Sequence, residues 1–149
     1  RGVNYEGYPG DVYYKGHNML NTLRTIVADD DKWKGLLRGV NEEFYHQTIV
    51  SNTLETFMAN YLGLNLESFF DQYLRDSRLP TFEYEIKKGA IKYRWRNTIE
   101  SFDMPVDVLI NDQKIRLVPT TSWAKQKIGK GDVVVDPNFY IQTVDLKKK

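Results

Sequence analysis

The chain has 149 residues with an apolar fraction of 41%, which is typical of a globular protein of one ordinary domain or two small ones. It contains no cysteine, which excludes disulfide bonds, thiolate catalysis and cysteine-based metal sites. With 21 Lys and Arg against 20 Asp and Glu, the net charge of +1 provides no domain-wide basic field, so we expect no nucleic-acid partner.

The first half of the chain has the apolar spacing of helices. Asp11 is a suitable N-cap for a helix over residues 12–27, and the acidic run 29–31 favours the start of a second helix. Gly63 is expected to end a third helix, and Asn65 to cap a fourth that runs towards its basic end near residues 75–78. Residues expected to face inward include Met19, Leu23, Trp33, Leu36, Leu37, Phe57, Met58, Tyr61, Phe69, Phe70, Tyr73 and Leu74.

From Thr81 the apolar period changes to two, which is typical of strands. Gly89 divides residues 81–96 into a predicted hairpin in which charged side chains such as Glu83 occupy a solvated face. Further strands are expected at 106–110, 114–118, 122–127, 133–135 and 140–144, with turns at 111–112 and 129–131. We therefore predict an α+β fold. A helical domain over residues 1–79, an antiparallel helical array, precedes a small antiparallel β-sandwich over residues 80–149.

One motif carries chemistry: Tyr13-Tyr14-Lys15-Gly16 opens the first helix with the pattern Tyr-x-Lys-Gly. This segment resembles the one that carries the transition-state tyrosine in gluzincin zinc aminopeptidases, the aminopeptidase N and leukotriene hydrolase family. The likeness extends to residues 31–37 and to residues 66–80, where Tyr73 stands in the place of the usual Trp. Residues 93–95 and 104–106 resemble parts of the β-sandwich that follows the catalytic domain in that family.

The resemblance implies that this chain is the C-terminal portion of a zinc metallopeptidase that acts on peptide substrates. Tyr13 would then donate a hydrogen bond to the oxyanion formed when water attacks the peptide carbonyl. A tyrosine hydroxyl suits this role because its ordinary pKa of about 10 keeps it protonated and uncharged at neutral pH. The zinc and its ligands would lie on an upstream catalytic-domain segment, so the chain alone is expected to be inactive.

The two histidines do not fit a zinc site. His17 is followed by Asn18 and His46 by Gln47, so neither begins the H-E-x-x-H motif of such peptidases. We expect no metal ligand in this chain.

Tyr8 lies in the turn-like segment 7–10, just before the proposed catalytic helix. It is a candidate substrate-cleft residue, and an exposed turn residue is an equal alternative. Lys15 and Gly16 are assigned structural roles, with Gly16 expected to allow a close approach between helices.

Other properties stay open at this level. No apolar run reaches the ~20 residues that span a bilayer, so we expect no transmembrane segment. Because the chain begins with Arg1 rather than Met, we expect a piece of a longer polypeptide, whose compartment is unknown and could be the bacterial periplasm. Substrate preference, exo or endo cleavage, activity of the parent protein and oligomeric state are not fixed.

A second hypothesis is a non-catalytic helical and β module that recognises protein or carbohydrate through exposed aromatic residues. Arg94-Trp95-Arg96 is one candidate, but strand alternation places Trp95 on the opposite face from both arginines. We therefore predict a core Trp95 between solvated arginines. An upstream H-E-x-x-H motif with a further glutamate would favour the peptidase over this module.

Overall fold

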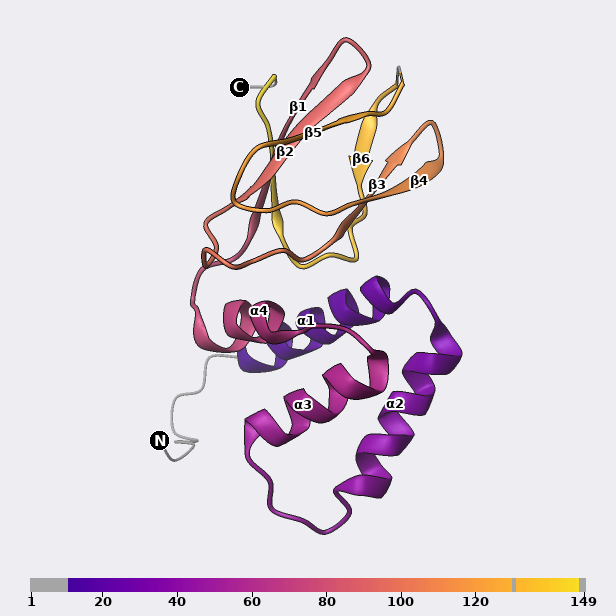
Figure 1. Ribbon diagram of the computed structural model, residues 1–149, viewed down its shortest axis with the longest axis vertical. Helices are drawn as coiled ribbons and strands as arrows, with labels where there is room; N and C mark the ends of the chain where they lie inside the picture. The colour runs from indigo at the N-terminus through magenta and orange to yellow at the C-terminus, as the bar shows by residue number, and fades with distance from the viewer. Residues whose placement is uncertain (1–10, 130, 148–149) are drawn as a thin grey trace.

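The computed structural model describes residues 11–129 and 131–147 and consists of a helical layer beneath two small sheets (Figure 1). The helical layer contains α1 (Asp11–Val27), α2 (Asp30–Glu43), α3 (Ser51–Leu62) and α4 (Glu67–Phe70), which continues into the π-helical turn η1 (Asp71–Arg75). The strands are β1 (Thr81–Lys87), β2 (Ala90–Arg96), β3 (Val106–Ile110), β4 (Gln113–Leu117), β5 (Ala124–Lys127), β6 (Val133–Val135) and β7 (Gln142–Asp145). The α+β class and the order of helices before strands are confirmed.

The strands form a four-stranded sheet in the order β5-β2-β1-β7 and a three-stranded sheet in the order β4-β3-β6. Both predicted hairpin turns are present: Lys88 and Gly89 join β1 to β2, and Asn111 and Asp112 join β3 to β4. All four residues have positive φ, from 48° to 72°, as expected for tight turns that follow the twist of antiparallel strands. One strand pair departs from the antiparallel prediction, because β1 and β7 pair in parallel.

The helices begin and end at the capping residues that the sequence predicts. Asp29 Oδ1 accepts hydrogen bonds from the backbone N–H groups of Asp31 and Lys32 at 3.0 and 2.9 Å, which caps α2. Gly63 adopts a left-handed conformation with a φ of 66° and ends α3. Asn65 Oδ1 accepts from the N–H of Glu67 at 3.2 Å, at the start of α4. α1 begins at Asp11, whose side chain lies outside the described part, so its predicted capping role is not described.

Several local predictions for the helices were wrong. Leu37, Tyr61 and Leu74 are 45%, 42% and 48% exposed rather than inward-facing. The fourth helix ends at Arg75, within its predicted basic end, but its last five residues form a π-helical turn that was not predicted. Among the residues that the structure describes, a Cβ on Gly16 would meet no atom within 4 Å, so the expected close approach is not seen at Gly16. The close approach occurs instead between α2 and α3, where Cβ atoms on Gly35 and Gly39 would press against the rings of Tyr61 and Phe57.

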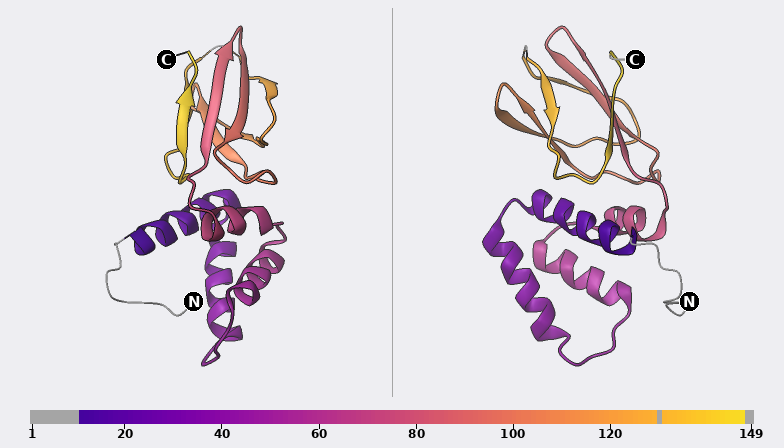
Figure 2. Two further views of the ribbon diagram at one scale, coloured as in Figure 1. Left: turned by 90° about the vertical axis from the view of Figure 1, so that its left-hand side faces the viewer. Right: turned by 180° about the vertical axis from the view of Figure 1, so that it is seen from behind.

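The two layers share one continuous apolar core. Buried residues of the helices and of both sheets belong to a single cluster, and α1 lies directly beneath the sandwich in every view (Figures 1 and 2). Thr22, fully buried on α1, accepts a hydrogen bond from the N–H of Tyr140 at 2.8 Å. The hydroxyl of Tyr73, which follows α4, donates to the carbonyl of Tyr140 at 2.8 Å. The segment before β7 is therefore fixed to two helical elements. Within the described ranges, no helix has the length and apolar character needed to cross a membrane.

A buried carboxylate organises the contact between the sandwich and α1. Asp107 on β3 is 1% exposed and accepts hydrogen bonds from Arg116 on β4 at 2.8 and 3.0 Å, while Lys114 lies 2.9 Å away. The same guanidinium donates to the carbonyls of Ile26 and Thr25 at 2.7 and 3.1 Å. Burial alone would raise the pKa of Asp107, but the hydrogen bonds from Arg116 and Lys114 outweigh it and hold that pKa below its ordinary value. The pair therefore places a cation at the carboxyl end of α1, where the free carbonyls favour it.

We predict that Arg116→Ala lowers the free energy of unfolding by about 3 kcal/mol, because it leaves a buried carboxylate short of its main partner and removes the donor to α1. Urea unfolding followed by circular dichroism measures this change. Lys114→Ala is the matched control, since Lys114 contacts the same carboxylate but is half-exposed, and its described ion pairs join it to Asp107 and Asp136 rather than to α1. Equal losses for the two variants would contradict the role assigned to Arg116.

Candidate functional site

The first described turn of α1 presents two tyrosines to solvent. Tyr13 is 80% exposed and Tyr14 is 71% exposed. Consecutive residues of a helix point about 100° apart, so the two hydroxyls face different directions. Tyr8, the predicted cleft residue, lies outside the described residues. The structure therefore leaves the Tyr13 hydroxyl outside the apolar core, accessible to any group that lies against this end of α1.

Lys15 connects this turn of α1 to the segment that follows η1. Its Nζ donates a hydrogen bond to the backbone carbonyl of Asp76 at 3.1 Å. The Asp76 carboxylate in turn accepts from the backbone N–H of Arg78 at 2.7 Å and from its guanidinium at 2.7 to 3.1 Å. These hydrogen bonds from Arg78, with a smaller contribution from Lys15, lower the pKa of Asp76 to about 2. The structural role predicted for Lys15 thus takes the form of a tether between the two ends of the helical layer.

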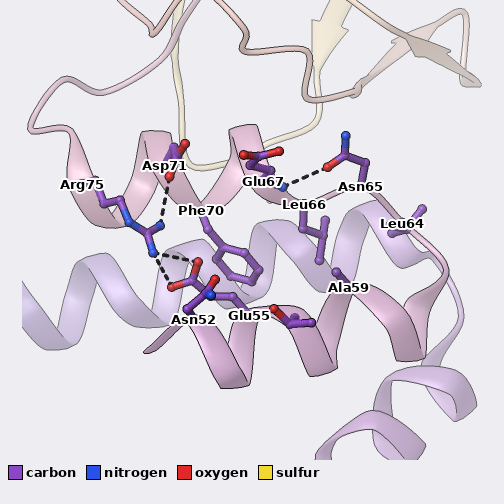
Figure 3. Close-up of a pocket in the computed structure, with 11 residues that line it drawn as sticks. Asn52, Glu55, Ala59, Leu64, Asn65, Leu66, Glu67, Phe70, Asp71 and Arg75 are labelled. Carbon is purple, nitrogen blue, oxygen red and sulfur yellow. Dashed lines mark hydrogen bonds and ion pairs between the residues drawn. The ribbon is translucent and has the colours of Figure 1, made fainter. Parts of the chain in front are cut away.

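A pocket of about 370 Å³ lies between α3 and the α4–η1 segment (Figure 3). Its charged end is built on Arg75, which donates to both oxygens of Glu55 at 2.8 and 2.9 Å and pairs with Asp71 at 3.1 Å. The rest of its lining mixes apolar side chains such as Leu66 and Phe70 with the polar side chains of Asn65 and Glu67. Figure 3 shows Glu55, Asp71 and Arg75 gathered on one side and Glu67 on the other, with the ring of Phe70 between the two helices.

The π-helical turn positions this charged end. Asp71 and Arg75 are the first and last residues of η1, and π-helical turns are often found at functional sites. The Glu55 side chain is 12% exposed, and Arg75 satisfies both of its oxygens. With one guanidinium between two carboxylates, the pocket is equipped for polar recognition.

The histidines and acidic residues do not assemble a metal centre. His17 and His46 are both exposed and lie on different elements. Across residues 11–129 and 131–147, no group of three or more His, Cys, Asp or Glu side chains could hold a metal ion. The described residues therefore do not fit a catalytic zinc site.

The outer face of the four-stranded sheet carries a cluster that the sequence did not reveal. Trp95 is 1% exposed, so its predicted core position is confirmed. The two neighbouring arginines are not merely solvated, because Arg94 and Arg96 contact the buried carboxylate of Glu83 at 2.7 and 3.2 Å. Burial would raise the pKa of Glu83, but the two arginines outweigh it and lower that pKa. Glu83, predicted to be solvated, is 3% exposed.

Trp123 adds an aromatic surface to this face. The Lys92 ammonium and the Arg94 guanidinium lie over its ring, 4.5 and 4.3 Å from the centroid. Trp123 is 36% exposed. The sequence could indicate this surface only through Trp123 and the basic residues of β2, which are far apart in the chain. Their contact depends on the pairing of β5 with β2.

Comparison of the chain with protein-family models and with curated proteins finds no match. The site is therefore interpreted from its own geometry.

We predict that Arg75→Ala lowers the free energy of unfolding by about 1 to 2 kcal/mol, because Glu55 loses a two-point partner in a poorly solvated position. Urea unfolding measures the loss. Arg78→Ala is the control, since Arg78 pairs with Asp76 within one loop rather than across two helices. Full recovery of the Arg75→Ala loss by a further Glu55→Gln change would confirm that the unpaired carboxylate causes it.

Proposed function

We propose that this chain is the C-terminal portion of a zinc-dependent metallopeptidase of the aminopeptidase type. It would contribute Tyr13 to the active site of the complete protein. The observation that carries the proposal is the exposed phenol of Tyr13, which lies within a Tyr-x-Lys-Gly motif on the first turn of α1. The opposite face of this helix is buried in the core. A hydroxyl in this position can donate a hydrogen bond to a group held by polypeptide outside this chain.

The chemistry assigned to Tyr13 is stabilisation of an oxyanion. When water attacks a peptide carbonyl, negative charge develops on the carbonyl oxygen, and a positioned neutral donor lowers the energy of that state. A tyrosine suits this role because it adds no charge of its own near a metal-bound carbonyl. The described residues contain no group that could hold the metal, so its ligands would have to come from the rest of the parent protein.

Two contacts support the positioning of Tyr13. Lys15 ties the front of α1 to Asp76, and Arg116 holds the carboxyl end of the same helix against the sandwich. A helix fixed at both ends holds a side chain on its first turn in a defined place, which a catalytic donor requires. The peptide substrate would then occupy a cleft between this end of α1 and the upstream catalytic-domain segment, with the 1–79 portion as one wall.

A second candidate function is a non-catalytic module that binds protein or carbohydrate. The exposed Trp123, stacked with Lys92 and Arg94 on a sheet face, is the observation that favours it. The zinc content and the peptidase activity of the longer gene product distinguish the two functions. A product that binds no zinc and hydrolyses no peptide would leave the binding module as the remaining proposal.

We predict that Tyr13→Phe in the longer protein lowers peptide turnover by about 100- to 1000-fold, the typical cost of losing one oxyanion donor. The zinc content should stay unchanged, because Tyr13 is not assigned as a metal ligand. Turnover of a chromogenic aminoacyl substrate and metal analysis of the purified protein measure the two effects. Tyr14→Phe is the matched control and should keep at least half of the activity, since its hydroxyl points about 100° away. Wild-type activity in Tyr13→Phe would remove the assignment.

A further inference from the structure

Lysines gather on the outer face of the four-stranded sheet and at the turn between β1 and β2. Three of them lie on the neighbouring strands β2 and β5 and two on β1 and its turn: Lys92, Lys125, Lys127, Lys87 and Lys88. All five are exposed. Among the residues that the structure describes, none of the five forms an ion pair. This surface, here called the lysine patch, therefore carries positive charge that the described part of the chain does not neutralise.

The strand register brings the cations of the lysine patch close together. Lys92 lies directly opposite Lys125, and like charges in that position are unfavourable. Lys127 lies opposite Ala90, which has Lys87 on its other side. Neighbouring strands are about 4.8 Å apart, and side chains on one face of a strand recur about every 7 Å. An anionic ligand with closely spaced charges would relieve the repulsion between these cations.

The acidic residues on this face leave the lysine patch uncompensated. Glu83 is already paired with two arginines of β2. Glu85 on β1 lies opposite Lys92, but the Lys92 ammonium lies over the ring of Trp123 and forms no ion pair with that carboxylate. Glu85 therefore borders the patch as a negative charge. A broad anionic plane such as a membrane would meet this carboxylate as well, whereas a linear polyanion can follow β2 and β5.

Charge spacing and aromatic content distinguish between the linear polyanions. An extended acidic peptide presents one side chain on each face about every 7 Å, which is wider than the separation of the strands that carry Lys92 and Lys125. Single-stranded nucleic acid stacks successive bases on several aromatic side chains. Trp123 is the single aromatic side chain among the described residues of this face. Neither polymer matches the patch.

A sulfated sugar matches both features of this surface. Sulfate esters can occupy more than one position on a sugar ring, so their charges are as closely spaced as the facing lysines. The ring also carries apolar C–H groups. Trp123 is 36% exposed, so part of its indole can contact such groups beside the ammonium groups of Lys92 and Lys125.

We propose that the lysine patch and Trp123 bind a sulfated polysaccharide. Its sulfate groups lie beside the ammonium groups of Lys92, Lys125 and Lys127, and one sugar ring contacts the exposed part of the Trp123 indole. This inference rests on the second candidate function, because it specifies the carbohydrate that such a module would bind. It does not involve Tyr13.

The test compares dextran sulfate with neutral dextran, which has the same sugar backbone without the charges. Isothermal titration calorimetry on the full chain is expected to show binding of dextran sulfate that is stronger than that of neutral dextran by about tenfold or more. Raising the salt concentration from ~50 to ~200 mM should weaken the binding of dextran sulfate by about tenfold or more, because binding releases the counterions of the polyanion.

Variants of the chain test where the polyanion binds. Lys92→Gln combined with Lys125→Gln removes the two facing cations and should weaken the binding of dextran sulfate by about tenfold or more. Lys34→Gln combined with Arg38→Gln is the matched control, because it removes the same charge from exposed positions of α2 in the helical layer. It should stay within about twofold of the wild type. Glu85→Gln removes the bordering carboxylate and should strengthen binding about twofold. Circular dichroism verifies that each variant is folded.

Equal binding of dextran sulfate by the two double variants would overturn the proposal. Tighter binding of polyglutamate, of a single-stranded oligothymidine or of phosphatidylserine vesicles than of dextran sulfate would also overturn it, since the patch would then serve a different partner. If the chain binds neutral dextran as well as dextran sulfate, the requirement for sulfate fails but the carbohydrate-binding module stands. If the folded chain binds neither polymer, the carbohydrate-binding alternative fails together with this inference.

Discussion

The ion pair between Asp107 and Arg116 is the contact on which the arrangement of the two layers depends. A strand residue between two fully buried valines, Val106 and Val108, would ordinarily face solvent, but Asp107 is 1% exposed and paired with Arg116, which also reaches the end of α1. A carboxylate in that place needs a cation, and the cation that meets it also satisfies two helix carbonyls. The guanidinium of Arg116 thus satisfies both the buried carboxylate of Asp107 and two carbonyls of α1. Without this partner, their burial would be unfavourable.

The orientation of the proposed catalytic turn follows from this contact. α1 contains 17 residues and is therefore about 25 Å long, so a small rotation at its carboxyl end would displace the Tyr13 end by several ångströms. The buried Gln72 steadies the connection on the other side. Its amide donates to the carbonyl of Arg78 at 2.8 Å and accepts from the N–H of Ile99 at 2.7 Å. The linker between η1 and β1 is therefore held by a hydrogen bond from Gln72. Lys15 bonds to Asp76 within this same linker.

Local patterns predicted most of the fold because they depend on neighbouring residues. The capping by Asp29, the left-handed Gly63 and the turns at Gly89 and Asn111 all follow from short-range steric and hydrogen-bonding preferences. The exposure of Leu74 departs from the periodic pattern because the π-helical turn changes the face that this residue presents.

The candidate site was less predictable because its contacts join residues far apart in the chain. Glu83 alternates as a solvated strand residue should, yet two arginines on the next strand make its burial favourable. The pocket around Arg75 depends on Glu55, which lies 20 positions earlier on another helix. The parallel position of β7 beside β1 likewise follows from how the chain returns across the sandwich. Beforehand, only short contiguous segments could be singled out: the motif that contains Tyr13 and the turn-like segment that contains Tyr8.

The three tryptophans differ in exposure, so their intrinsic fluorescence can report on binding to one surface of the chain. Trp33 and Trp95 are 8% and 1% exposed, whereas Trp123 is 36% exposed. A dissolved quencher such as iodide or acrylamide would therefore act mainly on Trp123. Anything that settles on the outer side of the four-stranded sheet would shield that indole, so a change in quenching would report occupancy of this surface without an added label.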